Sequence, residues 1–202
     1  MIKPLHKGGN YYETKNYRGV SIMSCVGKVF CSVLNSRVVE YLNDRGVPGC
    51  HQIAFRKKYR TSDHIMVVQT LVKKYIKKAQ DSARSERKNL YVAFVDLEKA
   101  YDTVWREALF WKILNNGIGG SMFRIIENMY SKYKATIKLE KGYTETFDTE
   151  RGVKQGCVLS PVLFNLYIND LPNIFDEICD PVTIGDKNIN CLMFADDLVL
   201  IS

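Results

Sequence analysis

The chain has 202 residues, enough for one domain or two small lobes, and its 46% hydrophobic and 25% charged residues are typical of a globular protein. No apolar run approaches the roughly 20 residues that a membrane helix needs, and residues 1–7 lack the apolar stretch of a signal peptide. The net charge of +7 excludes a strongly acidic protein and is compatible with a nucleic-acid partner.

The charge is divided unevenly along the chain. Residues 1–88 contain 18 Lys and Arg against 6 Asp and Glu, whereas residues 89–202 contain 11 against 16. A basic lobe that holds a polyanion beside an acidic lobe that holds metal ions would give this division, and a solvated basic surface explains the first half equally well. The six cysteines show no C-x-x-C pair and no zinc spacing with histidine, so we expect reduced thiols in an intracellular protein.

Two helices are predicted in the first part of the chain, after an opening of loop or short extended segments. The first helix has Ser24 as its cap and ends at Gly46. The second is capped by Thr61 or Ser62 and leads into a polar connection over residues 80–88. In both helices, apolar residues at helical spacing are predicted to face the core: Val26, Val29, Phe30, Val33, Leu34, Val38, Tyr41, Leu42, Ile65, Val68, Leu71, Val72, Tyr75 and Ile76.

Residues 52–60, between these helices, combine basic and aromatic side chains. Such a run could bind phosphates and stack on bases, or it could be a solvated loop, and the residues alone favour neither.

The second part of the chain opens with a predicted buried strand, residues 89–96, which ends in Asp96. The elements that follow are predicted as helices over 105–116, 121–133 and 160–175, a hairpin with arms 134–140 and 143–149, a flexible loop over 151–156 and a turn-rich segment over 180–188.

Residues 191–201 place two apolar runs on either side of Asp196 and Asp197, which predicts a hairpin with Ala195 and the two acids at its tip. Aspartate is common in turns, so this stretch alone favours an ordinary turn. If the strand of Asp96 lies beside the hairpin, however, three carboxylates converge at one edge. Hard oxygen ligands suit Mg²⁺, and two such ions can activate a 3′-hydroxyl and stabilise a leaving pyrophosphate.

Three short motifs resemble those of reverse transcriptases. Residues 95–102 (VDLEKAYD) resemble motif A, residues 151–161 (RGVKQGCVLSP) motif B and residues 194–197 (FADD) motif C. Residues 16–21 and 55–63 resemble motifs of the fingers. Together the ordered set is similar to the non-LTR (LINE-type) retrotransposon branch of the family.

The resemblance implies an α+β right-hand polymerase with an antiparallel palm sheet backed by helices. Within a single domain over residues 1–202, it implies fingers at about 1–88 and 113–152 and a palm at about 89–112 and 153–202, with the thumb absent. The implied activity is RNA-directed DNA synthesis, in which two Mg²⁺ ions, or Mn²⁺, assist nucleotide transfer from a dNTP to a DNA primer on an RNA template. The implied location is intracellular, in the nucleus for target-primed insertion, with no membrane partner.

The resemblance also implies roles for individual residues. Asp96, Asp196 and Asp197 correspond to the catalytic, metal-binding carboxylates, and the Leu97 carbonyl would lie near a metal. Tyr101 would lie under the incoming sugar and leave no room for a 2′-hydroxyl, although it could be a core tyrosine. The nucleotide-binding residues implied are Tyr101, Gln155, Gly156, Arg56 and Arg18.

Other residues carry alternative interpretations. Gly152 and Gly156 could serve only to shape their loop, and Asp102 could be a structural ion-pair partner. Ala54 and Lys58 stand where the family usually has glycine. Because the chain ends one strand past motif C, we expect it to be a fragment of a polyprotein, with little processive synthesis on its own. The alternatives in function are a catalytically inactive nucleic-acid-binding remnant and a telomerase-like or intron-type polymerase.

Overall fold

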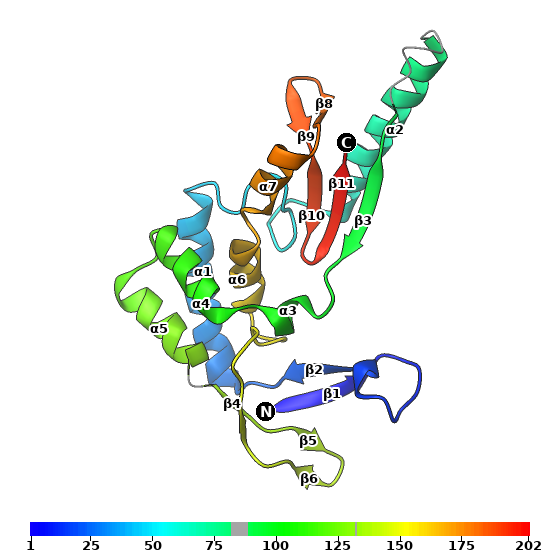
Figure 1. Ribbon diagram of the computed structural model, residues 1–202. Helices are drawn as coiled ribbons and strands as arrows, with labels where there is room; N and C mark the ends of the chain where they lie inside the picture. The colour runs from blue at the N-terminus through cyan, green and yellow to red at the C-terminus, as the bar shows by residue number, and fades with distance from the viewer. Residues whose placement is uncertain (82–88, 132) are drawn as a thin grey trace. The chain divides into compact units, whose positions relative to one another are not determined.

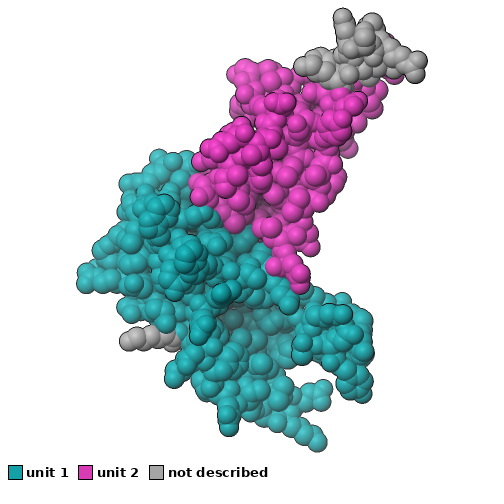
Figure 2. Space-filling view, viewed as in Figure 1, with its two compact units in different colours: residues 1–47, 99–167 teal, residues 48–98, 168–202 magenta. Residues whose placement is uncertain are grey.

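The computed structural model describes residues 1–81, 89–131 and 133–202, so most of the predicted polar connection lies outside the described residues. They form two compact units: unit 1 is residues 1–47 with 99–167, and unit 2 is residues 48–98 with 168–202 (Figure 2). Both units contain helices and antiparallel strand pairs, which confirms the predicted α+β class. None of the described helices is both long and apolar enough to span a membrane.

Unit 1 combines three antiparallel strand pairs with a group of helices (Figure 1). Its elements are β1 (Ile2–His6), the 3₁₀ turn η1 (Thr14–Asn16), β2 (Tyr17–Ser21), α1 (Cys25–Asn43), α3 (Ala100–Thr103), α4 (Arg106–Asn115), α5 (Gly120–Ser131), β4 (Lys134–Ala135), β5 (Lys138–Leu139), β6 (Gly142–Tyr143), β7 (Phe147–Asp148) and α6 (Ser160–Tyr167). The predicted hairpin is confirmed, because β4 pairs with β7 and β5 with β6.

Helix α1 begins as predicted, since the Gly27 backbone N–H donates to Ser24 Oγ at 3.1 Å. Its buried residues are Cys31, Leu34, Val38 and Leu42. The prediction of a core position is therefore wrong for Val26, Val29, Phe30 and Val33, which are all exposed. Both sets have helical spacing, so periodicity does not choose between them, and the small apolar Cys31 belongs to the stripe that is buried.

The helix predicted over residues 160–175 is two helices, α6 in unit 1 and α7 (Leu171–Ile178) in unit 2. Pro172 lies in the first turn of α7, a position where its missing N–H costs nothing. In one continuous helix the same ring would clash with the carbonyl four residues earlier, so the chain breaks before it. Helix α6 is buried over residues 162–166 and contacts α1 and α4, which makes it the central helix of unit 1.

Unit 2 is built on a three-stranded antiparallel sheet in the order β10–β11–β3. Its elements are α2 (Thr61–Asp81), β3 (Val92–Asp96), α7, β8 (Val182–Ile184), β9 (Lys187–Ile189), β10 (Cys191–Phe194) and β11 (Asp197–Ile201). The predicted adjacency of the strand that ends in Asp96 and the hairpin of Asp196 and Asp197 is confirmed.

Helix α2 lies beside this sheet (Figure 1). It packs through Leu71, which is 1% exposed and belongs to a cluster that includes Leu192 and Ile201. Val68 and Tyr75 join the cluster from the same helix. The prediction of inward-facing residues is wrong for Ile65, Val72 and Ile76, which are exposed. The strand β3, at an edge of the three-stranded sheet, is also less buried than predicted, and Phe94 is 77% exposed.

The cysteines give a direct test of these packing assignments. All six are free thiols, as predicted; Cys25 and Cys50 are exposed, whereas Cys31, Cys157 and Cys191 are buried. Burial raises the pKa of Cys31 to about 11, with Cys157 adding to the shift, and burial raises the pKa of Cys191 to about 12.

We expect iodoacetamide at about pH 8 to alkylate Cys25 and Cys50 rapidly and to leave the three buried thiols unmodified until denaturant is added, because the thiolate is the reacting form. Peptide mass spectrometry before and after unfolding measures this. Fast alkylation of Cys31 or Cys191 in the native protein would show that their surroundings are not as described.

Candidate active site

The hairpin of β10 and β11 ends in a two-residue turn. Phe194 pairs with Asp197, which leaves Ala195 and Asp196 between the strands. Ala195 has a φ of +56°, a left-handed conformation that a residue with a Cβ seldom adopts, and it is only 9% exposed. The predicted hairpin tip is therefore confirmed, with Asp197 as the first residue of β11 rather than a member of the turn.

Two of the three predicted carboxylates face each other across the sheet. In the register of β11 and β3, Asp197 lies directly opposite Asp96, and both are exposed. Like charges at directly opposed positions destabilise a sheet. Within the described part of the chain, no Lys, Arg or His forms an ion pair with either one. This end of the sheet therefore carries two negative charges without an ion-pair partner among the described residues.

The third carboxylate does not complete a cluster. Among the described residues, no three or more His, Cys, Asp and Glu side chains are grouped so that they could hold a metal ion. Asp196 is the second residue of the turn and has no cross-strand partner in the described pairing of β10 with β11. The structure thus brings Asp96 and Asp197 together and places Asp196 in the adjoining turn. Leu97 follows β3 directly and is half-buried.

A buried residue that the sequence analysis did not identify holds the hairpin tip. Gln52, 2% exposed, donates from Nε2 to the Ala195 carbonyl at 3.2 Å and accepts the Ala195 N–H at Oε1, at 3.0 Å. The same Oε1 accepts the Ala54 N–H at 3.0 Å. The only signal for this in the sequence is a polar residue beside the apolar Ile53 and Ala54.

The basic run over residues 52–60 is therefore partly buried: its first three residues lie in the protein interior, and most of the rest is exposed. Ile53 and Ala54 are buried, while Phe55 and the lysines that follow Arg56 are exposed. Arg56 donates from Nη1 to the carbonyls of Gly49 (3.0 Å) and Gln52 (3.3 Å). Its guanidinium is thus attached to unit 2, and its contact with a triphosphate stays a prediction.

The other predicted nucleotide-binding residues belong to unit 1. The ring of Tyr101 stacks on Phe164, with centroids 4.8 Å apart and planes 16° from parallel. The Tyr101 carbonyl accepts the Val153 N–H at 2.8 Å, which joins α3 to the loop of residues 151–156. The ring is therefore held on one face by packing, as the core alternative required, and is half-buried rather than enclosed.

Gln155 is held at both its main chain and its side chain. Its Nε2 donates to Asp102 Oδ1 at 2.8 Å, and its carbonyl accepts the Ser21 N–H at 2.7 Å. Asp102 is thus a hydrogen-bond acceptor for Gln155. Gly156 has a φ of +98°, and a Cβ there would lie 3.0 Å from the Ser21 carbonyl oxygen. The conformation and packing of the loop are therefore enough to require glycine at this position.

Arg106 determines the conformation of the preceding part of this loop. It is 4% exposed, and its Nε donates to the Gly152 carbonyl at 2.9 Å. Its other nitrogens donate to the carbonyls of Tyr130 (2.9 Å), Arg151 (2.7 Å) and Thr149, and to Thr149 Oγ1 (3.0 Å). The loop predicted as flexible is thus tied to α4 through a guanidinium whose donors are all used.

A second, half-buried cation holds the same loop. Lys154 Nζ donates to the Met129 carbonyl at 2.9 Å and lies 4.2 Å from the centre of the Tyr133 ring and 5.2 Å from that of Tyr130. Burial lowers the pKa of both Lys154 and Arg106, and burial raises the pKa of Tyr130. These cations are stabilised by carbonyl dipoles and aromatic faces.

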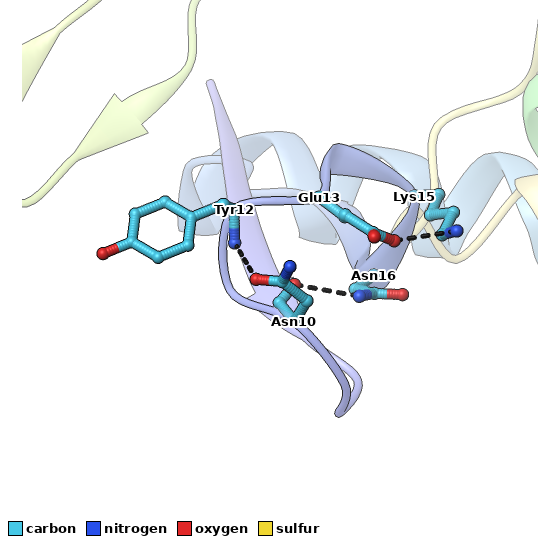
Figure 3. A network of polar contacts seen from close by, with 5 residues as sticks. All are labelled: Asn10, Tyr12, Glu13, Lys15 and Asn16. Atoms are coloured by element: carbon cyan, nitrogen blue, oxygen red, sulfur yellow. Dashed lines mark hydrogen bonds and ion pairs between the residues drawn. The ribbon is translucent and has the colours of Figure 1, made fainter.

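Arg18, the last predicted contact, lies exposed on β2 opposite Leu5. The connection before it is ordered by its own polar contacts: Asn10 accepts the Tyr12 N–H at 3.0 Å, and Asn16 donates to the Asn10 carbonyl at 2.9 Å (Figure 3). The role of Arg18 stays a prediction.

We expect Arg106→Lys to lower the free energy of unfolding by about 2–4 kcal/mol, because several buried carbonyls lose their donors at once. The exposed Arg124→Lys on α5 is the matched control and should change stability by no more than about 0.5 kcal/mol. Chemical denaturation of both variants measures this. Equal stability of the two variants would show that the five hydrogen bonds of the Arg106 guanidinium are not needed for the stability of the fold.

Comparison with known proteins shows which family this chain is similar to. The sequence matches the family described as reverse transcriptase (RNA-dependent DNA polymerase) over residues 5–202. A retrovirus-related Pol polyprotein from the type-1 retrotransposable element R2 of Popillia japonica is 30% identical over 203 residues, covering 96% of this chain and 26% of that protein. The RNA-directed DNA polymerase from mobile element jockey of Drosophila funebris is 22% identical over 204 residues, covering 100% of this chain and 21% of the relative.

Among solved structures, apo telomerase from Candida tropicalis, truncated from its C-terminal domain, is similar to this chain with a TM-score of 0.63. The match covers 93% of this chain and 41% of the telomerase, at 13% sequence identity, and therefore concerns the fold alone. The chain spans only about a fifth to a quarter of the length of the two curated relatives.

Proposed function

The chain belongs to the reverse transcriptase (RNA-dependent DNA polymerase) family, and we propose that it carries the polymerase site of a non-LTR retrotransposon protein. The proposed reaction is the addition of a deoxynucleotide to the 3′-hydroxyl of a DNA primer on an RNA template. The observation that carries this proposal is the facing pair of Asp96 and Asp197 across β3 and β11, in a chain that the family matches almost throughout.

The donor atoms at this end of the sheet fit a hard divalent cation. Carboxylate oxygens are the ligands that Mg²⁺ prefers, and a cation between Asp96 and Asp197 removes the repulsion between them. We assign these two residues, with Asp196 and the Leu97 carbonyl, as the ligands of two Mg²⁺ ions, or of Mn²⁺. The bound ions supply the positive charge that activates the primer hydroxyl and stabilises the leaving pyrophosphate.

The residues of unit 1 would bind and orient the nucleotide. We assign the Tyr101 ring, which stacks on Phe164, to the position under the sugar, and the main chain at Gln155 and Gly156 to contacts along the nucleotide. Arg56 and Arg18 are proposed to contact phosphates, for which a guanidinium is a bidentate donor.

The same proposal assigns subdomains and a location. Fingers at about 1–88 and 113–152 and a palm at about 89–112 and 153–202 follow the family resemblance. Synthesis primed at a chromosomal target would place the protein in the nucleus.

We expect Asp197→Asn to raise the melting temperature of the metal-free chain, because it removes one of two facing like charges. The same change should abolish the stabilisation that Mg²⁺ gives to the unaltered chain and lower primer extension by about 10²-fold or more. Thermal melts with and without Mg²⁺ use the 202-residue chain, and primer extension uses the full-length protein that its gene encodes.

The control is Asp186→Asn, an exposed acid on the turn between β8 and β9 that should change neither property. A lower melting temperature for metal-free Asp197→Asn would indicate a structural ion pair instead. Primer extension that survives either Asp197→Asn or Asp196→Asn would remove that residue from the catalytic assignment and favour the nucleic-acid-binding remnant.

Tyr101→Ala should admit ribonucleotides, because it removes the ring expected below C2′. We expect discrimination against ribonucleotides to fall at least about tenfold, or about 1.4 kcal/mol of differential transition-state binding. Tyr101→Phe keeps the ring and its stacking on Phe164 and should discriminate as the unaltered protein does. Competition between dNTP and rNTP in primer extension measures both, and unchanged discrimination in Tyr101→Ala would exclude Tyr101 as the sugar gate.

A further inference from the structure

We propose that Gln52 is a positioning residue that holds the turn of Ala195 and Asp196 in the conformation that presents the carboxylates of unit 2 to metal ions. The proposal rests on the metal-binding function proposed above for Asp96 and Asp197. It assigns a role to a buried side chain that contacts the hairpin tip and none of the reacting groups.

The turn needs support because of its backbone. In the left-handed conformation of Ala195, the Cβ lies too close to the following carbonyl oxygen, so the residue adopts it only where its surroundings impose it. Gln52 satisfies both polar main-chain groups of Ala195, the N–H through Oε1 and the carbonyl through Nε2. These two bonds fix the peptide planes on both sides of the strained residue.

Gln52 is itself held firmly. The Met193 N–H donates to the His51 carbonyl at 2.8 Å, and the Ile53 N–H donates to the Met193 carbonyl at 3.2 Å, which attaches the backbone of Gln52 to the outer edge of β10. The Ala54 N–H then orients the amide by donating to its Oε1. The Gln52 side chain is thus oriented by contacts other than its two hydrogen bonds to Ala195.

The chemistry requires a carboxamide at this position. Glutamine has a donor and an acceptor on one rigid plane, whereas methionine of similar size has neither strong group. Loss of the amide would let the turn relax toward a conformation with negative φ and move Asp196 and the start of β11. The pairing of β10 with β11 and the core around Leu71 would remain, so the geometry of the carboxylates should suffer more than the fold.

The experiment compares Gln52→Met with Leu71→Ala in the 202-residue chain. Mn²⁺ is the probe, because its electron paramagnetic resonance signal reports the free ion, and thermal melts report stability. We expect Gln52→Met to weaken Mn²⁺ binding about tenfold or more, as loss of a residue that orients metal ligands commonly does. Leu71→Ala, which removes a buried side chain of α2 and none of the hydrogen bonds to the turn, should lower the melting temperature and change Mn²⁺ affinity less than about twofold.

A second-site change separates positioning from general destabilisation. Glycine accepts a positive φ without strain, so Gln52→Met combined with Ala195→Gly should bind Mn²⁺ more tightly than Gln52→Met alone. Hydrogen exchange gives a reading that needs no metal: the Ala195 amide should exchange at least about tenfold faster in Gln52→Met, while the Leu198 amide, in β11, stays protected.

Three outcomes overturn the inference: Mn²⁺ affinity in Gln52→Met equal to that of the unaltered chain, no gain from Ala195→Gly in that background, or an unchanged exchange rate at Ala195. If Gln52→Met melts below the assay temperature, Gln52→Asn, which withdraws the amide by one methylene, replaces it with the same expectations. An unaltered chain that binds no Mn²⁺ overturns the proposed metal site itself, whereas normal binding by the unaltered chain with no effect of Gln52→Met overturns only the role of Gln52.

Discussion

The pairing of Asp96 with Asp197 across β3 and β11 is the constraint on which the organisation of unit 2 depends. The register of β11 with β3 sets Asp96 against Asp197, and a sheet with facing acids needs other interactions to keep its strands together. The apolar cluster around Leu71 supplies burial on one face of the sheet. Gln52 fixes the turn, and the chain at His51 to Ile53 covers the outer edge of β10. The apolar cluster and the Gln52 hydrogen bonds thus stabilise a sheet whose end at Asp96 and Asp197 is destabilised by like charges.

In unit 1, two cationic side chains, rather than acids, hold the loop over residues 151–156. Its loop over residues 151–156 has two glycines in left-handed conformations and approaches other main-chain segments too closely for side chains. Arg106 and Lys154 hold that loop from inside the protein by donating to carbonyl groups. Carbonyl dipoles and tyrosine faces compensate the buried charges without fixing a carboxylate there.

The sequence predicted the local elements of this protein better than their packing. The hairpin tip and the helix that starts at Ser24 follow from local patterns, because caps, turn residues and alternating apolar residues act over a few positions. Which face of a helix is buried depends on partners far away in sequence, so Val26 and Ile65 were assigned to the core although they are exposed. Gln52 and Arg106 were missed for the same reason, since their partners lie 143 and up to 46 residues away.

The facing acids also affect which substitutions a copy of this sequence would tolerate. A copy selected only for folding would become more stable by losing the acid at position 96 or 197, whereas a change at Gly152 would force its Cβ to within 2.8 Å of the Asp102 carbonyl oxygen. While folding is still selected, substitutions at the two acids should therefore be tolerated and substitutions at Gly152 removed. A comparison of these positions among related copies would separate copies kept for the proposed metal site from copies kept only as folded proteins.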